Sequence, residues 1–388
     1  MHIFEHRHCI VIGQNVYLAA ALMNKPLKIT CTVTNDLNYD QRMIRICTEL
    51  SYAGYDVTLV GFKRKNSKPI IERPFKQVRI PIIAEQGKLL YIDYWLKLFF
   101  FLMFKKVDVI CAIDLDTILP VYYASIIRSK KRVYDAHELF TELKEVISRP
   151  AIHKMWLWIA RHTIPNFPVG YTIGESYAAE LHKQYGVNYG IVRNATILKP
   201  LQIPAKPNKY ILYQGAVNVG RCFEQLIPAM KLVDAPLIIC GAGNFYDDAV
   251  ALVTQHSLQD KITFKGYVPP AQLTEYTLNA WIGITLFEET SLSNRLSLAN
   301  RFFDYMHFAV PQLCIKYPEY EKINADYEIA YLIEDPTPEN IAAALNKLLH
   351  DEPYYQRLQA NCLNAREKYC WQQEAKILLK TYAQFAKS

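Results

Sequence analysis

The chain has 388 residues, of which 51% are hydrophobic and 21% are charged. A chain of this length with no low-complexity tract is not disordered, and it predicts two or three domains. Residues 1–200 hold 27 basic against 17 acidic side chains, whereas 201–388 hold 17 against 20. The basic first part favours phosphates or an anionic membrane surface as partners. Nucleic acid is not favoured, because the basic residues do not alternate with aromatic ones in one stripe.

The nine cysteines have no C-x-x-C spacing, so nothing supports a disulfide framework or a zinc site. Several of them, including Cys31, Cys111 and Cys240, lie in or beside apolar runs, where a thiol behaves as a small hydrophobic side chain. We therefore expect reduced, structural cysteines in a cytoplasmic protein, and no metal.

No run of the sequence reaches the ~20 apolar residues that span a bilayer. The nearest lies within 89–106, LLYIDYWLKLFFFLMFKK, and is interrupted by Asp93 and Lys97. Two interpretations stay open. The segment is either a helix packed on a sheet or a helix lying on a membrane surface with its lysines at the edge. The second would place the protein peripherally at the inner face of the plasma membrane.

From Leu27 onward, apolar β-rich runs alternate with segments of helical periodicity. Residues 1–22 precede this series and are expected to be an extension outside the fold. The alternation is typical of a doubly wound parallel sheet. In the first part of the chain we predict strands at 28–34, 57–60, 107–112, 132–134 and 170–173.

A second α/β series follows the proline-containing linker 201–208. Its strands are predicted in ILYQG, PLIICGAG, ITFKGYV, WIGITLF and VPQLCIK. We therefore predict two Rossmann-like domains, at 23–203 and 204–370, and a C-terminal helix, 371–388, that crosses back to the first domain. Ligands bind beyond the carboxyl ends of strands in such sheets, so a central cleft between the two domains is the expected binding place.

Two strand ends in the second part carry glycines that would admit a phosphate. The first runs from Gly215 through Gly220 to Arg221, and the second is Gly241-Ala-Gly243. Glycine lets backbone amides approach a phosphate, and arginine adds a fork of donors. Neither is a G-x-G-x-x-G fingerprint, so NAD binding is disfavoured. The alternative to a phosphate site is a simple turn between a strand and a helix.

The segment 291–311, SLSNRLSLANRFFDYMHFAVP, places Asn300 and Arg301 at a predicted helix start and Asp304 one turn later. Helix-end amides and the Ser297 hydroxyl would take a diphosphate, and the Asp304 carboxylate would accept hydrogen bonds from two ribose hydroxyls. The alternative is a capped amphipathic helix with an ion pair between its charged residues.

Here the sequence resembles the family-four retaining glycosyltransferases of GT-B fold, which use nucleotide sugars, over nearly the whole chain from Lys28. The stretch 297–311 is close to SLPNKLFEYMAAGLPV, a pattern of one bacterial branch. By this resemblance the family's ribose-binding glutamate falls on Asp304 and its lysine on Arg301. A second glutamate of many relatives is Leu296 here, so sugar contacts are expected from the preceding loop. The residues expected to bind the donor are therefore Gly215, Arg221, Gly241, Ser297, Asn300, Arg301, Asp304, Glu288 and Glu289.

In the first part of the chain, residues 134–138, YDAHE, resemble the family's strand-end histidine motif. His137 is accordingly the first candidate for a catalytic residue, with Glu138 beside it, and the alternative is a histidine that caps a turn. The loop that begins at Thr34 resembles the branch's first loop. The acceptor side is expected at Asn35, Asp36, Asp114 and Asp116, although the last two would equally cap the next helix.

The resemblance thus implies a metal-independent, hexosyltransferase-like enzyme. It would move a sugar from a nucleotide diphosphate sugar to a glycan or lipid-linked acceptor with retention, in bacterial polysaccharide biosynthesis. Arg221 and Arg301 would stabilise the leaving diphosphate without a cofactor, and either that diphosphate or His137 would deprotonate the acceptor. Two alternatives stay open: a sugar-nucleotide epimerase of the same fold, and a non-catalytic membrane-docking or assembly protein.

Overall fold

The computed structural model describes residues 25–204 and 209–386, so the predicted extension 1–22 lies outside the described residues. The chain divides into two compact units, residues 1–193 with 374–388, and residues 194–373. The predicted boundary at 203 lies ten residues after this division. The reason is local, since Thr196 accepts a hydrogen bond from the Trp371 amide and Leu198 exchanges two with the Gln372 side chain.

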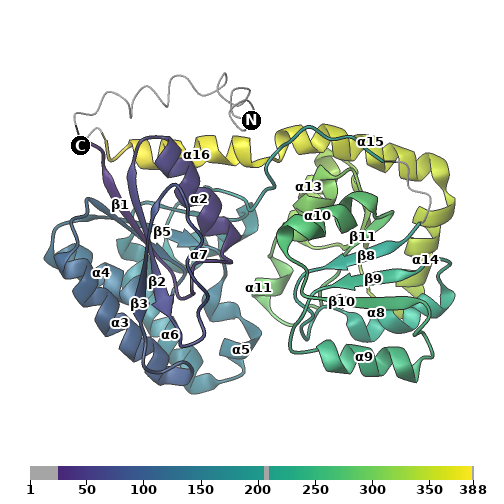
Figure 1. The fold of residues 1–388 in the computed structure, drawn as a ribbon, viewed down its shortest axis with the longest axis horizontal. Helices are drawn as coiled ribbons and strands as arrows, with labels where there is room; N and C mark the ends of the chain where they lie inside the picture. The colour runs from purple at the N-terminus through teal and green to yellow at the C-terminus, as the bar shows by residue number, and fades with distance from the viewer. Residues whose placement is uncertain (1–24, 205–208, 387–388) are drawn as a thin grey trace. The chain divides into compact units, whose positions relative to one another are not determined.

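The first unit contains one parallel sheet with the order β3-β2-β1-β4-β5-β6-β7 (Figure 1). Its strands are almost wholly apolar because helices cover both faces of a doubly wound sheet. The chain adds strands outward from β1 in one direction and from β4 in the other. The loops that follow β1 and β4 therefore run to opposite faces of the sheet. The strands are β1 (Lys28–Thr32), β2 (Asp56–Lys63), β3 (Lys76–Pro81), β4 (Val109–Ile113), β5 (Lys131–Ala136), β6 (Gly170–Thr172) and β7 (Gly190–Ile191).

Helix α4 of this unit packs against both α3 and α6, and Figure 1 draws these three helices together on one side of the sheet. The C-terminal helix α16 also belongs to this unit from Glu374 onward, and the hydroxyl of its buried Tyr382 lies 3.4 Å from that of Tyr171. The helices are α2 (Gln41–Tyr52), α3 (Gly87–Phe104), α4 (Ile118–Ile127), α5 (Lys144–Ile147), α6 (Pro150–Thr163), α7 (Glu175–Tyr185) and α16 (Trp371–Ala383).

The second unit repeats the plan with a parallel sheet ordered β10-β9-β8-β11-β12-β13. Its strands are β8 (Ile211–Gln214), β9 (Leu237–Cys240), β10 (Ile262–Gly266), β11 (Ile282–Thr285), β12 (Gln312–Ile315) and β13 (Ala330–Ile333). Its helices are α8 (Phe223–Ala229), α9 (Tyr246–Gln255), α10 (Pro270–Asn279), α11 (Leu292–Arg295), α12 (Asn300–His307), α13 (Pro318–Asp326), α14 (Pro338–His350) and α15 (Glu352–Lys368).

Two doubly wound parallel sheets, of seven and six strands, confirm the predicted fold class. The eight described cysteines are free and buried, as expected of small core side chains. Among the described helices, none combines the length and the apolar character that a bilayer crossing requires.

Candidate active site

In the second unit, the carboxyl end of β8 lies against the first turn of α12. Gly215 follows β8 with a φ of +126°, and a Cβ on this residue would lie 3.2 Å from Nη1 of Arg301. An L-residue is strained at this φ, so glycine is required both by the turn and by the neighbouring guanidinium. The helix starts at Asn300, as the sequence predicts.

Arg301 is a buried cation, 8% exposed. Its Nη1 donates to the Tyr213 hydroxyl at 3.2 Å and its Nη2 to the Leu286 carbonyl at 3.3 Å, while its Nε has no hydrogen-bond partner. No carboxylate of the described residues forms an ion pair with it. A buried charge without a counter-charge costs free energy, and an anionic ligand at this position would lower that cost.

A second guanidinium lies over the same aromatic ring. Arg221 is 4.4 Å and Arg301 is 4.6 Å from the centre of the Phe287 ring. Arg221 follows Gly220, whose carbonyl accepts a hydrogen bond from the Glu288 amide at 3.0 Å. Two guanidinium groups near one ring repel each other, and a ligand with two negative charges would relieve that repulsion.

Asp304, one turn beyond Arg301, contacts a different set of groups. Its Oδ1 accepts a hydrogen bond from the Thr196 hydroxyl at 2.7 Å, and its Oδ2 accepts one from the Gln214 amide at 3.0 Å. The Gln214 side chain is itself oriented by the Thr277 hydroxyl, 2.7 Å from its Oε1. These two hydrogen bonds fix the position of the Asp304 carboxylate on α12.

The sequence did not single out Thr196, Gln214 or Phe287. A signal existed for Gln214, which is the polar last residue of an otherwise apolar strand and directly precedes Gly215. Thr196 lies 108 positions before Asp304, and nothing local in the sequence joins the two.

The remaining donor-side candidates have other partners. The Ser297 hydroxyl donates to the Asn294 carbonyl at 2.8 Å, so its proton is already used and the predicted bond from this hydroxyl to a diphosphate is not formed by this geometry. Glu289 forms a surface ion pair with Arg295. The Ser291 hydroxyl caps α11, and Asn300 is exposed at the start of α12.

Gly241 and Gly243 allow two neighbouring loops of the second unit to pack closely. A Cβ on Gly241 would lie 1.8 Å from the Gly215 carbonyl oxygen, and one on Gly243 would lie 2.2 Å from that of Val217. Real Cβ atoms do not approach backbone so closely, so these glycines let the loop after β9 lie directly on the loop after β8. Their contribution to a phosphate site is to fix the backbone around Gly215.

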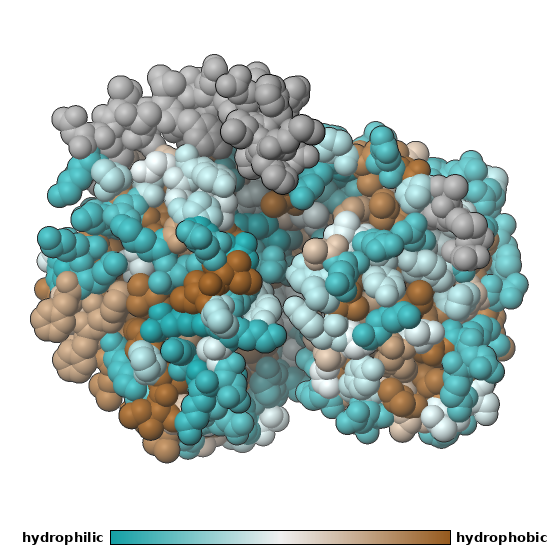
Figure 2. Space-filling view, in the orientation of Figure 1, coloured by the Kyte–Doolittle hydropathy of each residue, from teal (hydrophilic) through white to brown (hydrophobic). Residues whose placement is uncertain are grey.

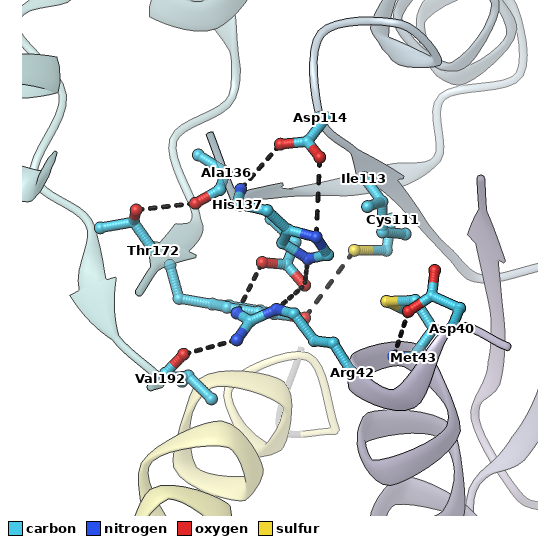
Figure 3. A network of polar contacts seen from close by, with 12 residues as sticks. Asp40, Arg42, Met43, Cys111, Ile113, Asp114, Ala136, His137, Thr172 and Val192 are labelled. Carbon is cyan, nitrogen blue, oxygen red and sulfur yellow. Dashed lines mark hydrogen bonds and ion pairs between the residues drawn. The ribbon is translucent and has the colours of Figure 1, made fainter. Parts of the chain in front are cut away.

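In the first unit, charged side chains form a chain at the ends of β4 and β5 (Figure 3). Asp135 is fully buried, and its Oδ1 lies 2.8 Å from Nη2 of Arg42, which also donates from Nη1 to the Val192 carbonyl at 2.8 Å. Nε2 of His137 lies 3.0 Å from Oδ2 of Asp135, and its Nδ1 lies 3.6 Å from Oδ2 of Asp114. The imidazole therefore lies between two carboxylates.

Asp114 joins the two strand ends. Its Oδ1 accepts hydrogen bonds from the backbone amides of His137 at 2.7 Å and of Glu138 at 3.2 Å. It has a φ of +53°, an uncommon value for a residue other than glycine and typical of strained functional positions. The alternative that Asp114 and Asp116 cap the next helix is wrong, because Thr117 is the N-cap residue of α4 and no side-chain bond caps that helix.

Burial sets the protonation of this cluster. It raises the pKa of Asp114 to about 7 and, with added repulsion from Asp114, that of Asp116 to about 7. Burial alone would lower the pKa of His137, but the charges of Asp135 and Asp114 outweigh it and raise that pKa. Both nitrogens of the imidazole thus face carboxylates. This geometry argues against the expectation that His137 accepts a proton from the acceptor hydroxyl.

The other acceptor-side candidates separate into two groups. Asp116 lies near the histidine and accepts a hydrogen bond from the Thr34 hydroxyl. The Asn35 amide instead donates to Asp40 at 2.7 Å, at the start of α2, and Asp36 accepts from the Asn38 amide at 3.4 Å. Local turn structure therefore occupies Asn35 and Asp36.

One candidate of the acceptor side and the question of a metal site remain. The Glu138 side chain is exposed. Within 25–204 and 209–386, no group of three or more His, Cys, Asp or Glu residues is arranged to hold a metal ion.

Comparisons with known proteins agree with this architecture. Residues 196–364 match the family model described as "Glycosyl transferases group 1". Sucrose-phosphate synthase from Thermosynechococcus elongatus is similar in structure, with a TM-score of 0.78 and 16% identity, over 93% of this chain and 100% of that one. HepE from Anabaena, in complex with UDP and glucose, has a TM-score of 0.74 and 13% identity over 92% and 100%. WaaG, a glycosyltransferase involved in lipopolysaccharide biosynthesis, has a TM-score of 0.66 and 14% identity over 91% and 99%.

No curated protein sequence matches the chain. The fold is nevertheless defined, and it is that of the GT-B glycosyltransferases. The resemblance stated from the sequence is confirmed at the level of the fold, and residues 196–364 of the second unit match the model of the group 1 glycosyltransferases.

Proposed function

We propose that the chain is a glycosyltransferase that moves a sugar from a nucleotide diphosphate sugar to a hydroxyl of a glycan or lipid-linked acceptor, with retention and without a metal ion. The observation that carries the proposal is the buried Arg301 guanidinium beside Gly215, which has no carboxylate partner among the described residues. The group 1 family match of the second unit and the UDP-bound HepE structure support it.

On the donor side, Arg301 and Arg221 would bind the diphosphate. As the bond from the anomeric carbon to the diphosphate oxygen breaks, negative charge grows on that oxygen, and fixed guanidinium groups stabilise it with little reorganisation. Asp304 would accept hydrogen bonds from the ribose hydroxyls, and Thr196 and Gln214 would orient it.

On the acceptor side, Asp114 and Asp116 would accept hydrogen bonds from sugar hydroxyls, and His137 would position the Asp114 carboxylate. The acceptor oxygen then bonds to the anomeric carbon, and its proton passes to the departing diphosphate oxygen. This assignment follows from the geometry of the cluster, because both His137 nitrogens face carboxylates and neither is directed at an acceptor hydroxyl.

Two alternatives are less consistent with the site. An epimerase needs carboxylates for acid–base chemistry beside the sugar, and the position of the family's second glutamate is Leu296. A non-catalytic protein has no need of a buried, unpaired Arg301, because such a group lowers stability in the absence of a ligand.

Calorimetric titration with UDP, GDP and ADP tests the proposal directly. We expect one diphosphate to bind wild type in the presence of EDTA and to lose most of its affinity in Arg301→Ala. The exposed, ion-paired Arg295 supplies the matched control in Arg295→Ala. Mass spectrometry with the corresponding nucleotide sugar and lipid or glycan extracts then detects the transferred sugar, and NMR of the product reads its anomeric configuration. Absence of binding by all three diphosphates would overturn the proposal, and an epimerised donor without transfer would favour the epimerase.

A further inference from the structure

Helix α3 exposes an apolar face. A helix that covers a sheet ordinarily turns a polar side to solvent. On α3, Leu89, Ile92, Leu96 and Phe100 recur three or four positions apart, and each is more than half exposed. The opposite side, with Leu98 at its centre, is fully buried in the unit. The exposed side of the helix is therefore mainly apolar, with the Asp93–Lys97 ion pair beside these residues.

The neighbouring helices extend this face. Tyr123, Ile126 and Ile127 of α4 are exposed, as are Met155 and Trp158 of α6. The helices join at the surface, where the Tyr123 hydroxyl lies 3.2 Å from Nε2 of His162 and the Trp158 ring stacks on His162 at 5.2 Å. Helix α4 contains no charged residue. We call the exposed apolar residues of α3, α4 and α6 the apolar face, and part of it is visible at the lower left of Figure 2.

Cations gather where the apolar face ends. Phe104, the last residue of α3, is 85% exposed, and Lys105 and Lys106 follow it. Arg128, after α4, donates to the carbonyls of Leu102 and Lys105 and so holds the ends of both helices together. A depression of about 310 Å³ opens beside them, lined by Lys25, Pro26, Leu27, Lys28, Lys106, Val107, Asp108, Arg128 and Lys130. Five of these nine side chains are cationic and one is anionic.

A second depression of about 300 Å³ is lined by Phe104, Lys105 and Lys106 together with Lys28 and the Lys76–Asp56 ion pair. An exposed aromatic ring and several lysines thus share one edge. This pairing of apolar side chains with a cationic rim is the arrangement that suits the boundary between lipid headgroups and acyl chains.

We propose that the apolar face and its cationic rim dock the first unit on a bilayer that contains anionic phospholipids. The apolar side chains would enter the headgroup region, and the lysines and Arg128 would contact lipid phosphates. A second copy of the chain is a poorer occupant, because pairing two such faces would bring two cationic rims together. The proposal does not depend on the glycosyltransferase assignment, since none of its residues belongs to the nucleotide or histidine sites.

Sedimentation with vesicles tests it. The full chain should bind vesicles of phosphatidylcholine with about 30% phosphatidylglycerol at low salt, and bind pure phosphatidylcholine much more weakly. About 0.5 M NaCl should release most of the protein from the anionic vesicles, because salt screens the attraction between the cationic rim and the lipid headgroups. Failure to bind anionic vesicles at low salt would overturn the proposal, as would equal binding to both compositions.

Paired variants locate the surface. The double variant Leu96→Gln with Phe100→Gln should weaken vesicle partitioning at least about tenfold, because two apolar side chains no longer enter the headgroup region. Its control is Tyr52→Gln with Tyr267→Gln, two exposed aromatic residues elsewhere. Lys105→Glu with Lys106→Glu should act on anionic vesicles only, against Lys265→Glu on the second unit. All of these positions are at the surface, and unchanged thermal midpoints verify folding.

Two results would contradict the assignment. If the controls weaken binding as much as the test variants do, the protein binds vesicles by non-specific hydrophobic adsorption or through its net charge, and not through the apolar face. If light scattering shows a dimer that Leu96→Gln with Phe100→Gln dissociates, a second copy covers the apolar face and the proposal is wrong.

Discussion

The Arg301 guanidinium lies 4.6 Å from the centre of the Phe287 ring, buried and with no carboxylate partner among the described residues. A cation–π contact contributes about 0.5–2 kcal/mol, which does not offset the burial of an unpaired cation. The proposed anionic ligand would supply the missing counter-charge, and this makes Arg301 the most informative position to replace.

Replacing Arg301 with alanine should reduce kcat/KM for the nucleotide sugar by about 30- to 150-fold, which corresponds to about 2–3 kcal/mol of lost transition-state stabilisation. Arg301→Lys should recover only part of this, because an ammonium cannot form the planar fork of a guanidinium. Steady-state kinetics with Arg295→Ala as control measure both. Wild-type kinetics in Arg301→Ala would exclude contact between Arg301 and the developing charge.

The hydrogen bond between Thr196 and Asp304 predicts a positioning effect. Thr196→Val should raise the KM for the donor by a few-fold and leave kcat unchanged, since one hydrogen bond of about 1 kcal/mol orients the carboxylate. Asp304→Ala should go further and remove the preference for UDP over 2′-deoxy-UDP. The control is Thr254→Val, whose hydroxyl bonds only to the Val250 carbonyl of its own helix. Retained discrimination in Asp304→Ala would show that the ribose lies elsewhere.

Two strands that the sequence did not predict, β3 and β13, lie at sheet edges, although the edge strand β10 was predicted. β3 and β13 each pair with one neighbour only, and a strand at the edge of a sheet requires fewer apolar residues than a central one. The interior strands were predictable because burial on both faces forces a continuous apolar run.

The candidate site, too, contains residues that the sequence predicts and residues that it does not. Arg301, Asp304 and His137 were predictable, because each lies at a helix start or strand end that local pattern identifies. Their partners were not, since Thr196 and Arg42 lie 108 and 93 positions from the carboxylates they contact. The local hydrogen bonds of Asn35 and Ser297, to groups within five positions, were also not predicted, and the roles of these two residues toward ligands stay predictions.

Gly241→Ala should destabilise the second unit by at least about 3 kcal/mol, because the new Cβ would lie 1.8 Å from the Gly215 carbonyl oxygen and backbone cannot move aside cheaply. Urea unfolding measures the effect. In the control Gly190→Ala, the nearest atom is 3.9 Å from the new Cβ, and we expect a change of less than about 1 kcal/mol. Equal stability of Gly241→Ala and wild type would mean that the two loops do not touch as described.

The Arg42–Asp135 pair should be costly to break. Arg42→Met leaves Asp135 buried without its counter-charge, and we expect a loss of about 3–5 kcal/mol in the free energy of unfolding. Lys76→Met breaks an exposed pair with Asp56 and should cost less than about 1 kcal/mol. NMR titration adds a separate measure, because Asp135→Asn should lower the pKa of His137. A pKa of His137 that is unchanged in Asp135→Asn would contradict the network.

The same cluster predicts how stability depends on pH. The folded pKa of Asp116, about 7, lies above its unfolded value near 4, so between these pH values the folded state binds more protons than the unfolded state. Its contribution to the free energy of unfolding therefore falls as pH rises from about 4 to 7. Asp114 acts in the same direction, and so does His137, whose raised pKa gives stability below pH 6.5 that is lost as pH rises through the folded value.

A shift of about three pKa units corresponds to about 4 kcal/mol, and halving it for the contact of Asp116 with solvent leaves about 2 kcal/mol. Asp116→Asn should remove this loss and be more stable than wild type at pH 8, with little difference near pH 4, where both side chains are neutral. The exposed Asp56→Asn provides the reference. Chemical denaturation at a series of pH values measures these differences. A wild type whose stability rises steadily from pH 4 to 7 would show that these carboxylates are ionised throughout. It would also show that the histidine does not lie in the environment described.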